Sequence, residues 1–263
     1  MDETRPDDDR DKIKSVDASL DIVEVLTDEG PLTITELAER LDRSQSNVLA
    51  HLRTLRDRGY VVEESEGYRP GLRYYEIGNK TKQNYPLYEH GTGPADDLAD
   101  ETGEYVWLMV QEQGRGYYIY KTGGDDAVES GAYTMGSRWR LNSTASGKMV
   151  LASMDETEVD AVLDRHGLEG ITPNTITDRE TLKAELETIR EEGYARDEEE
   201  SAIGIRGVAA PVRGFDGLLG TVSISGPASR IKGTYFEETL PDKLKETADI
   251  IRIRYNGAAA VDR

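Results

Sequence analysis

The sequence predicts an α+β protein of two domains, and three observations support that prediction. Three amphipathic helical segments follow one another between residues 16 and 59, and a short pair of strands comes directly after them. The rest of the chain alternates amphipathic helices with strand pairs joined by tight turns, a pattern typical of helices packed on an antiparallel sheet. At 263 residues the chain can form two such domains.

The first two helices are marked by apolar spacing and by their ends. The segment 16–31 has apolar residues at helical spacing and ends at Gly30-Pro31. The segment 32–42 has Leu37 and Leu41 on one face and begins at Thr33 or Thr35 as the N-cap residue. Before them, residues 1–10 are charged, without an apolar pattern, and predict no regular structure.

The third helix begins at Ser44 or Ser46 and ends at Gly59, with Val48, Leu52 and Leu55 on its buried stripe. Two short apolar runs separated by a turn at 65–67 follow it and predict a hairpin. Three helices and then a hairpin is the order of a winged helix-turn-helix, in which the third helix enters the DNA major groove.

Polar residues occupy the side of this third helix away from the apolar stripe. Hydroxyl, amide and guanidinium groups can bond to base edges or phosphates, and the wing can touch the flanking backbone. The predicted DNA-binding residues are Ser44, Gln45, Ser46, Asn47, Ala50, His51, Arg53, Thr54, Arg58 and Arg69.

The net charge of −20 is unusual for a protein that binds DNA. The 52 acidic residues are spread along the chain, and arginine outnumbers lysine. This pattern is typical of proteins from very salty cytoplasm, where charge fields are screened within about 3 Å at 1 M ionic strength. We interpret the chain as halophilic, so its acidity does not argue against DNA binding.

The second half begins with a connecting helix near residues 71–83 and a helix over 84–102. Strands are predicted over 105–111 and 116–122, and a hairpin over 207–227 with its turn at 215–217. Amphipathic helices are predicted over 145–154, 156–167 and 178–193, and a closing helix over 235–255 despite Pro241.

Several motifs resemble the IclR family of transcriptional regulators. "LTITELAERL", "SNVLAHLRTLRDRGYVV" and "GYRPGLRYYEIG" resemble its winged-helix domain, and "NSTASGKMVLASM", "IREEGYARDEEE" and "GIRGVAAPVRGFDGLLGTVSISGP" resemble its effector-binding domain, in the same order. One departure is Ala50, where recognition helices of the family often carry arginine, so base contacts of other members do not transfer.

The resemblance implies a winged helix-turn-helix over residues 14–78 and a GAF-like effector-binding domain over 79–263. It also implies homodimers or homotetramers that read a pseudo-palindromic operator on double-stranded DNA. Matched onto this chain, the effector-binding residues of the family are Ala145, Ser146, Asp197, Ile205, Gly207, Ser223 and Ser225.

The residues themselves favour a small organic acid as the effector. Asn142, Ser143 or Thr144 can cap a helix that starts with small residues, which leaves its first N–H groups open to an anion. Ser223 and Ser225 lie two apart on a strand and therefore point to one face, where both can bond a carboxylate or hydroxyl.

Other classes of function are poorly supported by the sequence. With no cysteine and three widely spaced histidines we expect no metal site, and we expect no other cofactor. Ser146 and Lys148 lack the S-x-x-K spacing of a serine nucleophile, so we expect no catalytic residues. No apolar run is long enough for a membrane span, and we expect a cytoplasmic protein. The alternative is a winged-helix sensor that acts through protein contacts without specific DNA binding.

Overall fold

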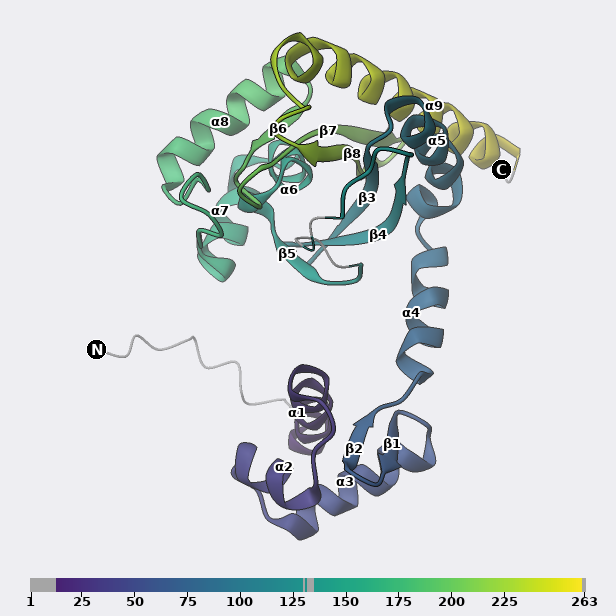
Figure 1. The fold of residues 1–263 in the computed structure, drawn as a ribbon, viewed down its shortest axis with the longest axis vertical. Helices are drawn as coiled ribbons and strands as arrows, with labels where there is room; N and C mark the ends of the chain where they lie inside the picture. Colours follow the sequence, from purple (N-terminus) through teal and green to yellow (C-terminus); the bar gives the residue numbers. More distant parts are fainter. Residues whose placement is uncertain (1–12, 130, 132–134, 262–263) are drawn as a thin grey trace. The chain divides into compact units, whose positions relative to one another are not determined.

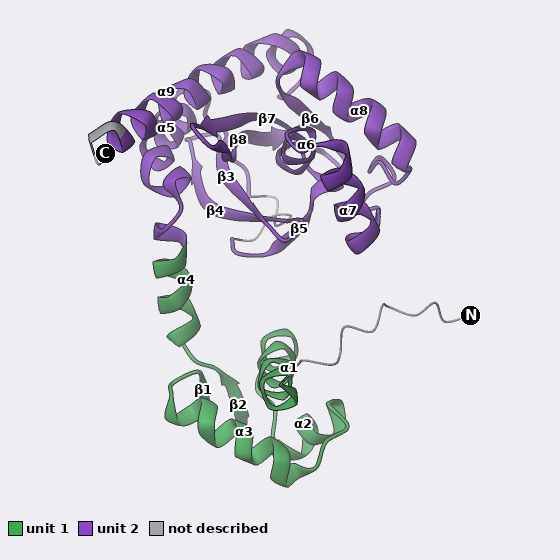
Figure 2. Cartoon of the chain, turned by 180° about the vertical axis from the view of Figure 1, so that it is seen from behind, with its two compact units in different colours: residues 1–81 green, residues 82–263 purple. Residues whose placement is uncertain are grey.

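The computed structural model describes residues 13–129, 131 and 135–261. The chain divides into two compact units, residues 1–81 and residues 82–263, which are coloured separately in Figure 2. The predicted boundary after residue 78 falls near this division. The prediction of irregular structure for residues 1–10 lies outside the described residues.

The first unit contains three helices and a hairpin in the predicted order (Figure 1): α1 (Lys14–Glu29), α2 (Ile34–Arg40), α3 (Gln45–Asp57), β1 (Val61–Glu64) and β2 (Gly67–Pro70). Thr33 is the N-cap of α2, where it forms a capping box with Glu36. Ser44 is the N-cap of α3, and its side chain accepts a hydrogen bond from the backbone N–H of Asn47.

A small apolar core holds this unit together and fixes the hairpin. Ile22, Leu26, Leu37, Val48 and Leu52 are buried in one cluster. The hairpin is joined to the segment before α2 by two backbone hydrogen bonds between Leu32 and Tyr68, of 3.0 and 2.8 Å. At Gly67, with φ of 137°, an added Cβ would collide with the Leu32 backbone, so only glycine fits this approach.

Helix α4 (Arg73–Gln83) confirms the predicted connecting helix and has no buried residue. At its start, Tyr74 packs edge-to-face on Tyr60, with ring centroids 5.0 Å apart. The division between the two compact units falls near the end of this helix.

The second unit is built on a six-stranded antiparallel sheet in the order β5-β4-β3-β8-β7-β6. Its strands are β3 (Tyr105–Glu112), β4 (Arg115–Gly123), β5 (Arg138–Arg140), β6 (Ala195–Glu198), β7 (Ile205–Gly214) and β8 (Gly217–Pro227). The predicted strand pairs are confirmed. Strands β5 and β6 were not predicted, because they are short, charged edge strands without apolar alternation.

Helices cover both faces of this sheet (Figure 1). Helices α5 (Pro86–Thr102) and α9 (Leu240–Val261) pack with Val208, Val222 and Ile224 on one face. On the other lies α6 (Ala145–Ala152), backed by α7 (Glu156–His166) and α8 (Arg179–Glu192).

Pro241 does not interrupt the closing helix, because α9 begins at Leu240 and proline is tolerated in a first turn. A π-helical turn, Tyr235–Thr239, comes directly before it. In the part of the chain that the structure describes, no helix is both long and apolar enough to span a membrane.

Candidate DNA-contacting helix and ligand cavity

The polar side of α3 is a continuous exposed surface. Val48 and Leu52 are buried in the core, and the side of the helix away from them is exposed. The predicted residues that are exposed on or next to this helix are Ser44, Gln45, Ser46, Asn47, Ala50, Arg53, Thr54 and Arg58. The structure therefore places eight of the ten predicted DNA-binding residues where a partner can reach them.

His51 lies differently from the prediction. It is half-buried, and its Nδ1 atom is 2.8 Å from Ser19 Oγ on α1. Position 51 follows the buried Val48 stripe by three residues, so its ring turns toward the neighbouring helix rather than outward. The exposed surface is therefore centred on Ser46, Ala50 and Arg53, and His51 lies at its border.

The β1–β2 hairpin, which is the wing of this unit, neutralises part of the basic charge near α3. Arg56 Nη1 lies 2.5 Å from Glu63 Oε2, and Arg69 Nη2 lies 2.6 Å from Glu64 Oε1. Arg53 and Arg58 make no ion pair with any described residue. The net positive charge of this face is therefore smaller than its number of arginines indicates.

In the second unit, the predicted effector residues meet around one small cavity on the α6 side of the sheet. It is lined by Trp107, Tyr118, Thr144, Ala145, Ser146, Asp197, Gly207, Ser223, Ile224 and Ser225. Six of the seven predicted residues are in this set, and Ile205, at the start of β7, is not. The volume is about 10 Å³, enough for about one water molecule.

Strand register brings these side chains together from distant parts of the chain. Asp197 of β6 pairs with Gly207 of β7, and Gly207 pairs in turn with Ser225 of β8. Ser223 is opposite Trp107 of β3. Cross-strand partners share a face, so one row of the sheet provides most of the cavity wall.

Trp107 and Tyr118 were missed by the sequence reasoning. Trp107 Nε1 donates a hydrogen bond to Ser225 Oγ at 2.9 Å, and Ser146 Oγ donates one to Ser223 Oγ at 2.9 Å. Both predicted strand serines are thus already bonded to protein groups. The run "YVWLM" is apolar throughout, and Trp107 is buried in a cluster with Met109 and Tyr118, so the sequence does not mark it as a cavity residue. Only the register with β8 places it beside the serines.

Two buried polar groups set the chemistry of the cavity. Asp197 is 1% exposed, and its Oδ1 accepts hydrogen bonds from the backbone N–H groups of Glu200 at 2.8 Å and Ser201 at 3.3 Å. Burial raises the pKa of Asp197, and burial also raises the pKa of the Tyr118 hydroxyl. Tyr118 is therefore a neutral hydroxyl in the cavity wall at ordinary pH.

The start of α6 is more closed than predicted. Thr144 is the N-cap, and its side chain accepts from the Gly147 N–H at 2.9 Å. Asn142 instead donates to the carbonyls of Glu169 and Ile176, and Ser143 donates to the Arg140 carbonyl. The helix start faces the cavity through Ala145 and Ser146, not through open solvent.

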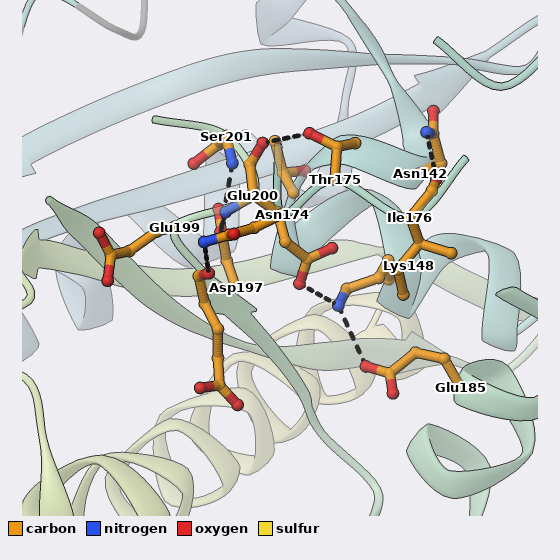
Figure 3. A network of polar contacts seen from close by, with 12 residues as sticks. Asn142, Lys148, Asn174, Thr175, Ile176, Glu185, Asp197, Glu199, Glu200 and Ser201 are labelled. Atoms are coloured by element: carbon orange, nitrogen blue, oxygen red, sulfur yellow. Dashed lines mark hydrogen bonds and ion pairs between the residues drawn. The ribbon is translucent and has the colours of Figure 1, made fainter. Parts of the chain in front are cut away.

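Behind the cavity, a buried lysine joins α6 to α8 and to the segment after β6 (Figure 3). Lys148 is 1% exposed, and its Nζ lies 2.5 Å from Glu200 Oε1 and 3.0 Å from Glu185 Oε1. Burial alone lowers the pKa of Lys148, but the two carboxylates outweigh that effect and the pKa is raised. Glu200 also carries the backbone N–H that Asp197 accepts, so the cavity wall and the ion pairs share one segment.

A winged helix-turn-helix joined to an α+β unit with a small polar cavity is typical of one class of protein, the ligand-responsive DNA-binding regulator. Comparison with known proteins specifies the class further. The family model "Bacterial transcriptional regulator IclR C-terminal" matches residues 80–253, and a second family model, HVO_A0114, matches residues 16–78. The chain belongs to the IclR family of transcriptional regulators, and the prediction that it is a regulator rather than an enzyme is confirmed.

Individual relatives agree with this membership. The chain is 34% identical to the HTH-type transcriptional regulator KdgR of Escherichia coli, over 87% of this chain and 88% of that protein. It is 29% identical to a probable HTH-type transcriptional regulator, ArcR, of Halobacterium salinarum, over 94% and 95%. The crystal structure of Thermotoga maritima IclR is similar with a TM-score of 0.74 and 32% identity, over 93% of this chain and 99% of that one.

Proposed function

We propose that the exposed face of α3 reads an operator in the DNA major groove. Eight of the ten predicted contact residues are exposed there, and Asn47 presents a side-chain amide of the kind that pairs with adenine. The DNA-binding domain is the winged helix-turn-helix of residues 14–78, as the sequence predicts. A homodimer or homotetramer would present two copies of α3 to a pseudo-palindromic site. The protein acts in the cytoplasm, where its operator is.

The second part of the proposal concerns the effector. Residues 79–263 bind a small organic acid in the cavity on the α6 side of the sheet, and binding changes operator affinity. The support is the grouping of the Ser146, Ser223 and Tyr118 hydroxyl groups beside Asp197. Because the cavity now holds about 10 Å³, the walls must separate to admit the acid. No cofactor takes part.

A substitution at Asn47 tests the DNA contact. Asn47→Ala should weaken binding to the promoter of the protein's own gene by about tenfold or more, because one good base contact is worth about 1 to 3 kcal/mol. Fluorescence anisotropy with that promoter, alongside a scrambled duplex, measures the change. Circular dichroism should show an unchanged fold, since the Asn47 side chain is exposed.

Two threonines provide a matched control. Thr54 on α3 and Thr27 on α1 are both exposed, and each donates its hydroxyl to the carbonyl four residues earlier, at 3.1 and 2.8 Å. Thr54→Ala should weaken promoter binding while Thr27→Ala should not. Equal affinity of the wild type, Asn47→Ala and Thr54→Ala would instead favour a sensor that acts through protein contacts.

A thermal-shift screen tests the effector class. Organic acids, including hydroxy acids and aromatic acids, should raise the melting temperature of the full chain, because a ligand that binds only the folded state stabilises it. A cation or long-chain lipid that binds tightly while all acids fail would contradict the proposal.

A further inference from the structure

Three arginines gather at the β4–β5 edge of the second unit. Arg115 lies on β4 directly opposite Arg140 of β5, and Arg138 lies two residues from Arg140. Cross-strand partners share a face of a sheet, and so do alternate residues of one strand, so all three side chains leave the same face. Like charges placed directly opposite destabilise a sheet, which makes this arrangement unfavourable for the isolated fold.

The nearby acids do not balance this charge. Arg140 forms an ion pair with Glu169 and donates to the carbonyl of His166. Arg115 and Arg138 form no ion pair with the residues that the structure describes. Glu112, the cross-strand partner of Arg115 on β3, accepts a hydrogen bond from the Tyr85 hydroxyl and keeps its charge, so two carboxylates, Glu112 and Glu169, accompany three guanidinium groups. Burial lowers the pKa of Arg115, and the charges of Arg140 and Arg138 lower it further. The cluster is thus positively charged in a chain whose net charge is −20.

An open cavity of about 660 Å³ lies over the cluster. Arg115, Arg138 and Arg140 line it together with Ser137, Trp139, Glu169 and Ile171, and none of these residues lines the cavity beside α6. The volume is in the range of small-molecule sites, about 300 to 1,000 Å³. The site therefore differs from the proposed effector cavity in position, size and charge.

We propose that this arginine cluster binds a compact polyanion, a metabolite bearing phosphate or several carboxylates, as a second ligand. Planar guanidinium groups match the paired oxygens of phosphate and carboxylate. The Glu169 contact and the His166 carbonyl hold Arg140 in place, while Arg115 and Arg138 line the cavity without an ion pair to any described residue. An anion relieves the repulsion between the paired strands, so binding should stabilise the fold.

Trp139 gives the site a built-in reporter. Its Nε1 donates to Ser137 Oγ at 2.9 Å, and its ring lies against Tyr118 with centroids 6.2 Å apart. Since Trp139 lines the arginine cavity and Tyr118 lines the cavity beside α6, one aromatic contact joins the walls of the two cavities. Filling the arginine cavity should change the fluorescence of Trp139.

The test is titration of the full chain with pyrophosphate and, separately, with citrate, at constant ionic strength set with KCl. Calorimetry and tryptophan fluorescence should show saturable binding of one polyanion per chain. Arg138→Gln and Arg115→Gln should each weaken binding by about tenfold or more. The matched control is Arg252→Gln, since Arg252 lies on α9 and its guanidinium pairs with Asp249. The affinity of this variant for the polyanion should equal that of the wild type.

Thermal melting separates a binding role from a structural one. Arg138→Gln should melt no lower than the wild type, because it removes a repulsive charge, and it should lose the stabilisation by polyanion that the wild type shows. Binding of pyrophosphate alone identifies a phosphorylated ligand, and binding of citrate alone identifies a polycarboxylate. No binding of either, or equal binding by the wild type, Arg138→Gln and Arg252→Gln, overturns the proposal.

Discussion

At the scale of single residues, the cavity beside α6 contains groups that are costly to bury. Asp197 is a carboxyl group at 1% exposure, and the backbone N–H groups of Glu200 and Ser201 donate to it. Burying a charge is unfavourable unless it is paired, and the raised pKa of Asp197 reflects that penalty. The charged form of Asp197 therefore opposes folding.

The raised pKa of Asp197 predicts a pH dependence. Below about pH 4 the side chain is protonated in the folded and the unfolded chain and carries no penalty. As the pH rises from there toward the raised folded pKa, the unfolded chain loses its proton first, so stability falls. Asp197→Asn should remove this loss and keep the acceptor oxygen, so at neutral pH the variant should be at least as stable as the wild type.

Denaturant unfolding of both proteins at a series of pH values and fixed KCl measures this difference. The gap in the free energy of unfolding should grow in favour of Asp197→Asn above about pH 4. Parallel profiles for the two proteins would show that Asp197 titrates alike in the folded and unfolded chains.

Gly207 keeps the floor of the cavity open. An added Cβ at this position would lie 3.0 Å from the Ile224 carbonyl oxygen and 3.8 Å from Asp197 Cβ. Gly207→Ala should therefore fold with a cost of about 1 to 3 kcal/mol from overpacking and lose organic-acid binding by about tenfold or more.

Gly257 on α9 is the matched control for this change. An added Cβ there meets nothing within 4 Å, so Gly257→Ala should stabilise the helix by about 0.5 to 1 kcal/mol and bind acids normally. Thermal-shift and calorimetric titration of both variants check the pair. Unchanged acid binding in Gly207→Ala would place the effector elsewhere.

At the scale of elements, Lys148 links α6 to its neighbours through a buried pair of contacts. Removing one partner of a buried ion pair leaves an uncompensated charge, which costs about 3 to 5 kcal/mol. Lys148→Met leaves Glu200, at 5% exposure, without its cation, and should lose about that much stability. Adding Glu200→Gln to Lys148→Met should recover part of the loss.

Lys183 forms exposed ion pairs between two helices of the same unit and can be compared with the buried Lys148. It joins α8 to α7 through Asp160 at 2.9 Å and Glu156 at 3.1 Å, but its side chain is 26% exposed and its acids are exposed more. Lys183→Met should cost about 1 kcal/mol or less, because exposed ion pairs contribute little. Guanidinium unfolding curves measure both variants, and equal costs at the two lysines would contradict the distinction.

At the scale of the whole molecule, the acidic surface predicts an unusual response to salt. For an ordinary DNA-binding protein each phosphate contact steepens the loss of affinity by about 0.9 in the log–log slope. Here Arg56 and Arg69 are paired with wing acids, and dispersed acids repel DNA at low salt. Salt should remove more repulsion than attraction, because hydrogen bonds from Asn47 and Thr54 do not depend on the distant field.

Specific binding should therefore hold or improve as KCl rises from about 0.1 M into the molar range. This behaviour would fit the halophilic interpretation. Anisotropy with labelled promoter DNA measures the trend, and circular dichroism at each salt step shows whether the protein stays folded. A steep fall in affinity of the folded protein would mean that its arginines act as ordinary phosphate clamps.

The sequence by itself determined most of the elements and the order of the two parts. Local rules suffice for these, since apolar spacing, caps such as Thr33 and Ser44, and turns such as 215–217 depend on neighbours in the chain. The family motifs added the expected positions of the effector residues.

Only the tertiary structure decided what depends on pairing between distant segments. The register of β3 with β8 placed Trp107 beside Ser225, the packing of α1 turned His51 inward, and the edge strand β5 set Arg140 against Arg115. Strands β5 and β6 are too short and charged to show an apolar pattern, and they form because a neighbouring strand offers hydrogen bonds. No short stretch of the sequence predicts such contacts, because the free energy that favours them comes from groups that are distant in the chain and that only the fold brings together.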